Sequence, residues 1–206
     1  MKSLAVFVVA LFMAFPAWAE SLVEHAENLV HHKVQFTLEP NLGKISVTDH
    51  MTLTGQGGLG FVLSSAFEVG SLRVDGVVQK PNLSNEILTI ELGSKGAHTI
   101  EMTTHAKLPQ RIQPPFLRAQ GGLIGGDWLA HPKGYKATWD VMGQSPKGQK
   151  WLIPGTLQFE SEDEKFYRAR FTSERPAVLP ILISGPFEVH ERWVGDIRLR
   201  TYFHQN

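Results

Sequence analysis

Residues 33–55 read KVQFTLEPNLGKISVTDHMTLTG and contain two stretches in which apolar and polar side chains alternate. The apolar residues that share one side of these stretches are Val34, Phe36, Leu38, Ile45, Val47, Met51 and Leu53. A period of two is typical of a β-strand with one buried face, because successive side chains of a strand point to opposite sides. Residues 40–43, Pro-Asn-Leu-Gly, are typical of a turn. The segment therefore predicts two consecutive half-buried strands.

The same alternation recurs in EILTIEL (86–92), AHTIEMTTHA (97–106) and DIRLRTYF (196–203). Further short strand-like stretches follow residue 135, and glycine-containing turns separate them. The one helix that we expect is a short amphipathic helix over residues 20–31. The pattern predicts an all-β fold, an antiparallel β-sandwich or saddle of many short strands, and not a parallel α/β sheet.

Alternation stops between residues 107 and 134, a segment rich in glycine and proline. A long excursion of this composition is typical of an ordered loop or of a connection between two sheets. We interpret residues 20–206 as a single β-rich domain. Its two sheet regions, about 33–106 and 135–204, are joined by this segment.

Residues 1–19 have the features of an export signal. A short positive start, MKS, precedes the apolar run LAVFVVALFMAF, and Ala17-x-Ala19 is the small-x-small pattern that precedes a cleavage site. The run is too short to be a stable membrane anchor. We expect cleavage after Ala19 and a periplasmic or secreted product of the Gram-negative bacterial type. No other segment is apolar enough to cross a membrane, so we expect no membrane partner after the signal is removed.

Composition excludes several kinds of chemistry. The chain has no Cys, which excludes a catalytic thiol and a cysteine-bound metal. Its 20 basic and 20 acidic side chains leave no basic excess, so we expect no nucleic-acid partner. The acidic run at residues 160–164 is typical of a solvated turn, and no Gly-x-Ser-x-Gly or phosphate-binding loop is present. We assign no catalytic and no cofactor-binding residue.

Two histidine patterns invite a metal hypothesis. EVHERWVG, residues 188–195, contains His190-Glu191, the first two letters of a zinc-protease helix. That helix needs a second His four residues after the first, and Val194 occupies the position here. The neighbouring residues favour a strand. His31 and His32 are adjacent, so on a strand they point to opposite faces and cannot easily share an ion. We assign no metal site.

The tryptophans allow two interpretations. Trp128, Trp139, Trp151 and Trp193 can each fill a core between sheets, which is the role we expect for most of them. Alternatively, two or more of them lie coplanar on an open face and form a platform for carbohydrate. As a candidate binding surface we retain Trp128, Pro132 and Trp139.

The order of these segments resembles the N-terminal β-domain of aminopeptidase-N-like zinc metallopeptidases. The resemblance covers almost the whole chain after residue 19. It rests on the order of the strands and on local patterns, which are Val69 to Gly76, Thr103 to Ala106, Trp128 with Pro132, and Gly185-Pro186-Phe187-Glu188-Val189 followed by a hairpin that ends in Tyr202-Phe203.

The resemblance implies a role and no reaction. In that family the zinc-binding helix belongs to the next domain, against which the β-domain packs, and this sequence contains no His-Glu-x-x-His. It therefore implies a non-catalytic domain that acts by packing or by binding a protein or peptide, with zinc present only if a catalytic domain follows. An apolar patch on the face that meets that domain is a hypothesis to test, and a natural stand-alone form should carry polar residues there instead. Two alternatives stay open: an N-terminal fragment of a zinc aminopeptidase, active only with its catalytic domain, and a carbohydrate-binding β-sandwich.

Overall fold

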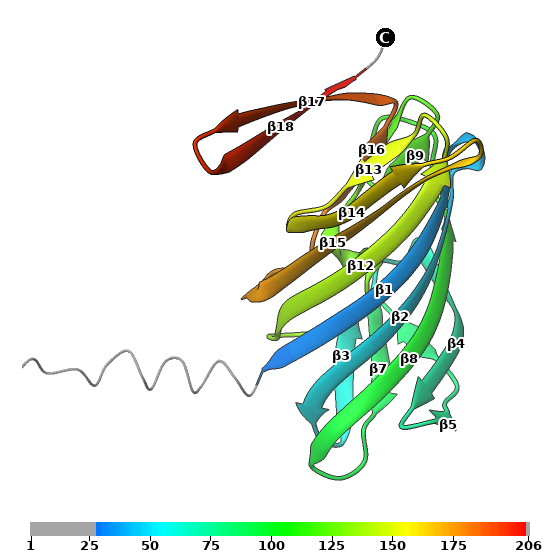
Figure 1. Ribbon diagram of the computed structural model, residues 1–206. Coiled ribbons are helices and arrows are strands. Elements are labelled where there is room, and N and C mark those ends of the chain that lie inside the picture. The colour runs from blue at the N-terminus through cyan, green and yellow to red at the C-terminus, as the bar shows by residue number, and fades with distance from the viewer. Residues whose placement is uncertain (1–27, 205–206) are drawn as a thin grey trace, which may run out of the picture.

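The two alternating stretches form neighbouring antiparallel strands in a computed structural model, which describes residues 28–204 (Figure 1). They belong to an eight-stranded sheet, hereafter the main sheet. Its strands, in spatial order, are β14 (Thr156–Glu162), β15 (Phe166–Ala177), β12 (Lys136–Pro146), β1 (Leu29–Glu39), β2 (Lys44–Gly55), β8 (Gly96–Lys107), β4 (Phe67–Val74) and β5 (Val77–Val78).

Three smaller sheets complete the fold. The first contains β13 (Lys150–Leu152), β16 (Leu182–Gly185), β10 (Gly121–Ile124) and β9 (Phe116–Arg118). The second contains β11 (His131–Pro132), β3 (Gly58–Val62), β7 (Ile87–Glu91) and β6 (Asn82–Ser84). The third is the hairpin of β17 (Phe187–Val194) and β18 (Ile197–His204). The strand alternation predicted for residues 33–106 is confirmed in β1, β2, β7 and β8.

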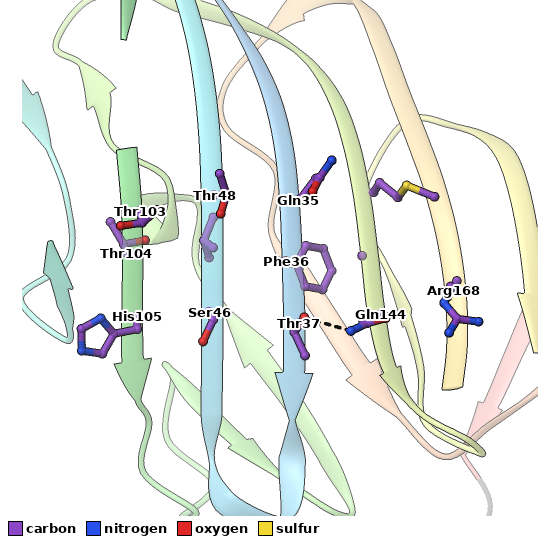
Figure 2. Close-up of a pocket in the computed structure, with 13 residues that line it drawn as sticks. Gln35, Phe36, Thr37, Ser46, Thr48, Thr103, Thr104, His105, Gln144 and Arg168 are labelled. Carbon is purple, nitrogen blue, oxygen red and sulfur yellow. Dashed lines mark hydrogen bonds between the residues drawn. The ribbon is translucent and has the colours of Figure 1, made fainter. Parts of the chain in front are cut away.

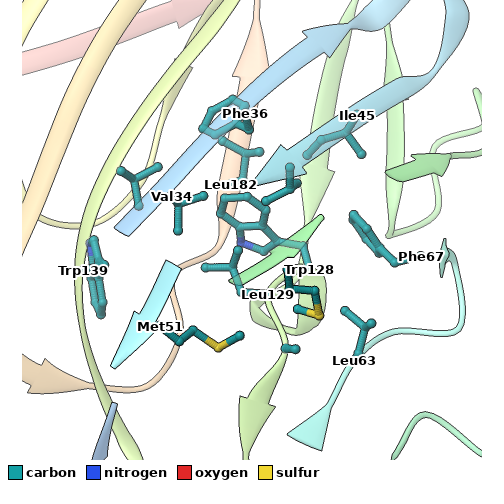
Figure 3. Close-up of a cluster of buried hydrophobic side chains, with 14 of the residues drawn as sticks. Val34, Phe36, Ile45, Met51, Leu63, Phe67, Trp128, Leu129, Trp139 and Leu182 are labelled. Carbon is teal, nitrogen blue, oxygen red and sulfur yellow. The ribbon is translucent and has the colours of Figure 1, made fainter. Parts of the chain in front are cut away.

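The core lies between the main sheet and the two four-stranded sheets, because one face of each long strand is apolar. Trp128, at the end of the short 3-10 helix η2 (Gly126–Trp128), is fully buried there. Phe36 of β1 packs edge-on against it, with the ring centroids 5.6 Å apart, and edge-on against Trp151, with the centroids 4.6 Å apart. Figure 3 shows Trp128 among core side chains from the main sheet, such as Val34 and Ile45, and from a covering sheet, such as Leu182.

The main sheet is mixed, which corrects the prediction of a purely antiparallel fold. Strand β12 runs parallel to β1, with Phe36 opposite Gly143. Parallel neighbours need a long crossover. The Gly/Pro-rich segment 107–134 is part of the path that brings the chain back to the β1 edge, and it carries β9, β10, η2 and β11. Strands from both predicted sheet regions therefore lie side by side in one sheet.

The prediction of a helix over residues 20–31 is wrong for the part of that range that the structure describes. Leu29 begins β1, so residues 29–31 are extended; residues 20–27 and the expected signal at 1–19 lie outside the described residues. Helical structure between residues 28 and 204 is limited to two 3-10 turns, η1 (Pro40–Leu42) and η2. Neither turn is long or apolar enough to span a membrane.

An ion pair between buried His98 and half-exposed Asp75 fastens the turn between β4 and β5 to β8. In His98, which is 7 % exposed, Nδ1 donates to Asp75 Oδ2 at 2.7 Å and Nε2 lies 3.0 Å from the Ser94 carbonyl oxygen. Asp75 also accepts from the Thr99 backbone N–H at 2.8 Å. Because both ring nitrogens face acceptors, the geometry favours the imidazolium form. The hydrogen bond to Asp75 raises the pKa of His98 above its usual 6.5 and lowers the pKa of Asp75 below 3.8.

Stability should therefore fall as the solution becomes alkaline through the folded pKa of His98. A raised folded pKa contributes stability that is complete below the unfolded value of 6.5 and lost above the folded one. Asp75 acts in the other direction, and its contribution is lost as the pH falls below 3.8. We expect urea unfolding to give a lower free energy at about pH 8 than at about pH 6. The fall should be much smaller in His98→Gln and retained in His50→Gln; an equal fall in all three proteins would contradict the assignment.

Candidate interaction surfaces

The C-terminal hairpin projects from one end of the molecule (Figure 1). Strands β17 and β18 pair with each other and with no other strand between residues 28 and 204, so both hairpin edges are open. The pairing runs from Phe187 opposite His204 to Val194 opposite Ile197, and Gly195 supplies the left-handed turn conformation with φ of 58°. A two-stranded ribbon of this kind is marginally stable by itself.

The register divides the hairpin into two faces. Val194 lies opposite Ile197 and Glu188 lies opposite Phe203, and these pairs point to the same side. Four apolar side chains on this side are about half exposed, namely Val194 (51 %), Ile197 (63 %), Leu199 (48 %) and Phe203 (53 %). We call this set the outer hairpin face. The exposed polar side chains of Glu188, His190, Arg192 and Thr201 share this side with them.

One ion pair joins the opposite face of the hairpin to the main sheet. The Arg200 side chain is 12 % exposed, and its Nη2 donates to Glu160 Oε2 of β14 at 2.7 Å. Its Nε lies 3.0 Å from Glu191 Oε1. The Tyr167 hydroxyl donates to Glu160 Oε1 at 2.8 Å, and burial, followed by the Glu160 charge, raises the pKa of that hydroxyl. This cluster joins the opposite face to β14, although Trp193, on the same face nearer the tip of the hairpin, is 63 % exposed.

The sequence predicted the two faces and misjudged their surroundings. Ile197, Leu199 and Phe203 were expected on a buried face, and all three are exposed. Glu160 was expected in a solvated turn; it lies in strand β14 and joins the ion-pair cluster instead. The apolar alternation of β18 is the signal that could have identified the surface. Its apolar side faces solvent because no other sheet of residues 28–204 packs on the outer hairpin face.

The open face of the main sheet carries a second surface feature. A shallow furrow of about 690 Å³ crosses β1, β2, β8, β12 and β15 (Figure 2). Its polar lining consists of Gln35, Thr37, Ser46, Thr48, Thr103, Thr104, His105, Gln144 and Arg168. Gln144 Nε2 donates to Thr37 Oγ1 at 3.2 Å. These hydroxyl and amide groups can exchange hydrogen bonds with a ligand, but they include no nucleophile paired with a base.

The residues retained from the sequence as a candidate binding surface lie in the interior. Trp128 is 0 % and Trp139 is 3 % exposed, and Pro132 is buried in β11. Each indole N–H donates to a backbone carbonyl, from Trp128 to Pro180 at 2.9 Å and from Trp139 to Pro154 at 3.1 Å. Trp128 and Trp139 therefore fill the core, which was the first of the two interpretations. Of the tryptophans from residue 28 to 204, Trp193 alone is largely exposed, so this part of the chain presents no coplanar pair to a carbohydrate.

The residues of both histidine patterns lie in strands. His190 and Glu191 lie in β17, as predicted, and His190 Nε2 bonds the Glu188 carboxylate at 2.8 Å. His31 and His32 point to opposite faces of β1, with His31 Nδ1 bonded to Thr138 Oγ1 at 2.9 Å and His32 buried. No group of three or more His, Cys, Asp or Glu within residues 28–204 has the arrangement of a metal site.

The mixed main sheet, the two covering sheets and the terminal hairpin define the fold of the N-terminal β-domain of M1 zinc metallopeptidases, as the sequence resemblance predicted. An M1 zinc metallopeptidase from Deinococcus radiodurans superposes with a TM-score of 0.65 at 15 % identity, over 82 % of this chain and 45 % of that one. Aminopeptidase A from Legionella pneumophila, in complex with aspartic acid, gives a TM-score of 0.66 at 14 % identity, over 84 % and 23 %.

This chain therefore matches less than half the length of these enzymes. No protein-family model matches the sequence, and no curated protein does.

Proposed function

We propose that this chain is an exported, non-catalytic docking domain that packs against a protein partner through the outer hairpin face. The observation that carries the proposal is the exposure of four apolar side chains, Val194, Ile197, Leu199 and Phe203, on one side of a hairpin that pairs with no other strand between residues 28 and 204. Several large apolar side chains exposed on one face of a domain are typical of an interaction site. The likeness in fold makes an M1-type catalytic domain the first candidate for the partner.

The hairpin gains from such a contact. Burying the outer hairpin face would remove half-exposed apolar side chains from water, which is the main favourable term in protein association. A partner that covers this face also supports a ribbon that is marginal by itself. The open edges of β17 and β18 offer backbone groups for β-addition, but the apolar face supplies the larger driving force.

In this proposal the chemistry belongs to the partner. Zinc enters only with a catalytic domain. The second candidate function is that of an N-terminal part of a zinc aminopeptidase, and it is favoured by the lengths of the matched enzymes, of which this chain covers 45 % or less in these two comparisons. Both candidates predict no hydrolysis of aminoacyl-nitroanilides by the purified chain alone, and such hydrolysis would contradict both. A reading frame that continues past Asn206 and encodes His-Glu-x-x-His would decide for the second candidate.

Polar substitutions on the outer hairpin face should abolish docking without unfolding the domain. We expect the double variant Ile197→Ser with Phe203→Ser to bind an M1-type catalytic domain, produced without its own β-domain, at least about tenfold more weakly than the parent chain, since two buried apolar side chains are lost. Titration calorimetry measures the change. Because both positions are exposed, the circular dichroism spectrum should stay unchanged.

The matched control changes two exposed valines at another edge of the molecule. Val77 and Val78 are 66 % and 67 % exposed in β5, and Val77→Ser with Val78→Ser should leave the affinity unchanged. Equal weakening by both double variants, or by neither, would exclude the hairpin as the docking surface.

A further inference from the structure

A buried polar pair interrupts the apolar face of the main sheet. His32 of β1 is 0 % exposed and Asp49 of β2 is 1 % exposed. His32 Nδ1 lies 2.7 Å from Asp49 Oδ2. A carboxylate accepts, so this contact places the ring proton on Nδ1 and leaves a lone pair on Nε2. Nε2 is inaccessible to solvent and has no hydrogen-bond partner among the described residues.

A second histidine with the complementary arrangement comes from another sheet. His131 of β11 has Nε2 2.7 Å from the Tyr135 carbonyl oxygen, which can only accept. The proton is therefore on Nε2, and the lone pair is on Nδ1, which is also buried without a hydrogen-bond partner in this part of the chain.

The two rings are close enough to share one ion. Their centroids are 6.0 Å apart and their planes are inclined by 33°. Imidazoles that bind one metal ion at about 2.0–2.1 Å from nitrogen have centroids roughly 5–6.5 Å apart. Left unpaired, each buried acceptor destabilises the fold, because its hydrogen bond to water is lost and not replaced. One ion between them would satisfy both.

Both histidines also carry the hydrogen bonds that metal ligands need. A ligating His typically donates its other N–H to a carboxylate or a backbone carbonyl, which fixes the tautomer and the ring orientation. Asp49 does this for His32, and the Tyr135 carbonyl does it for His131.

The kinds of donor atom near the two histidines indicate which metal ion would bind. Met51, 1 % exposed, is the cross-strand partner of His32 in β2, so a thioether faces the interior in the same row of the sheet. Thioether sulfur favours copper(I), and imidazole also suits copper. We propose that His32, His131 and Met51 form a binding site for a single copper(I) ion.

An approach to the site exists beside His131. A cavity of about 310 Å³ lies at the surface there, lined by Val62, Gly126, Asp127, His131, Tyr135, Val178 and Leu179. His131 lines this cavity and its ring lies 6.0 Å from that of His32, so an ion that enters here reaches His131 first. The site is built by the β-sheets alone and does not depend on the docking proposal.

The test is a copper(I) competition titration of the full chain against bicinchoninate without oxygen. We expect one tightly held ion per chain, loss of that ion in His32→Gln and in His131→Gln, and an affinity about 10–100-fold lower in Asp49→Asn. His50→Gln and His105→Gln are the controls, because their side chains are 53 % and 56 % exposed, and they should bind as the parent does.

A measurement on the unsubstituted chain guards against misfolded variants. In ¹⁵N spectra of the histidine rings, copper(I) should shift His32 Nε2 and His131 Nδ1 and leave the other histidines in place. No retained ion, shifts confined to exposed histidines, or equal loss in the control variants would overturn the proposal.

Discussion

Replacing Phe36 with alanine is expected to lower the free energy of unfolding by about 3–5 kcal/mol, the usual cost of deleting a buried aromatic ring. Phe36 is 4 % exposed and packs edge-on against both Trp128 and Trp151. Its loss removes the contact that joins β1 to the helical turn η2 and to β13. Equilibrium urea unfolding, followed by tryptophan fluorescence, measures the change.

Phe159→Ala is the matched control, because Phe159 is 45 % exposed in β14. It should change the free energy of unfolding by less than about 1 kcal/mol. If the two alanine variants are equally destabilised, the core does not centre on Phe36 and its tryptophan neighbours.

Gly143→Ala should be destabilising by about 1–3 kcal/mol, because it overpacks the same place. Gly143 of β12 lies opposite Phe36 of β1, and a Cβ at this position would be 2.3 Å from Phe36 Cζ. No atom fits at that distance, so the ring or the strand must shift. Urea unfolding of the single variant measures the cost.

The two substitutions should be strongly coupled. In the Phe36→Ala background the ring is gone, and the methyl group of Gly143→Ala enters the space that it leaves. We expect a coupling free energy of about 0.5–3 kcal/mol in the double-mutant cycle, with the second substitution nearly harmless. If the two losses of unfolding free energy are additive, the close approach of Phe36 is not the reason for a glycine at position 143.

Much of the strand pattern could be predicted, because it depends on local alternation. The inward-facing side chains of residues 33–55, such as Val34 and Ile45, are buried as the period of two requires. The parallel pairing of β1 with β12 could not be predicted, since it depends on how the long segment 107–134 returns the chain to the sheet. Gly143 gives no local sign that it lies opposite a phenylalanine.

The surfaces were harder to predict than the strands. Alternation in β18 separates Leu199 from Arg200 correctly, but a period of two cannot distinguish a face covered by its own chain from one open to solvent. The adjacent His31 and His32 do diverge, as expected. The neighbour of His32 is His131, which reaches it from another sheet and is distant in sequence. Such a pair becomes visible only when the sheets are placed together.

Photo-crosslinking from Leu199 in the cells that produce the protein tests the docking claim most directly. A benzophenone amino acid in place of Leu199 should give a covalent adduct whose partner, identified by mass spectrometry, is an M1-type catalytic domain. The same amino acid in place of Val78 should give no such adduct. If the adduct forms equally from both positions, or if neither position captures that domain, the outer hairpin face is not its docking site.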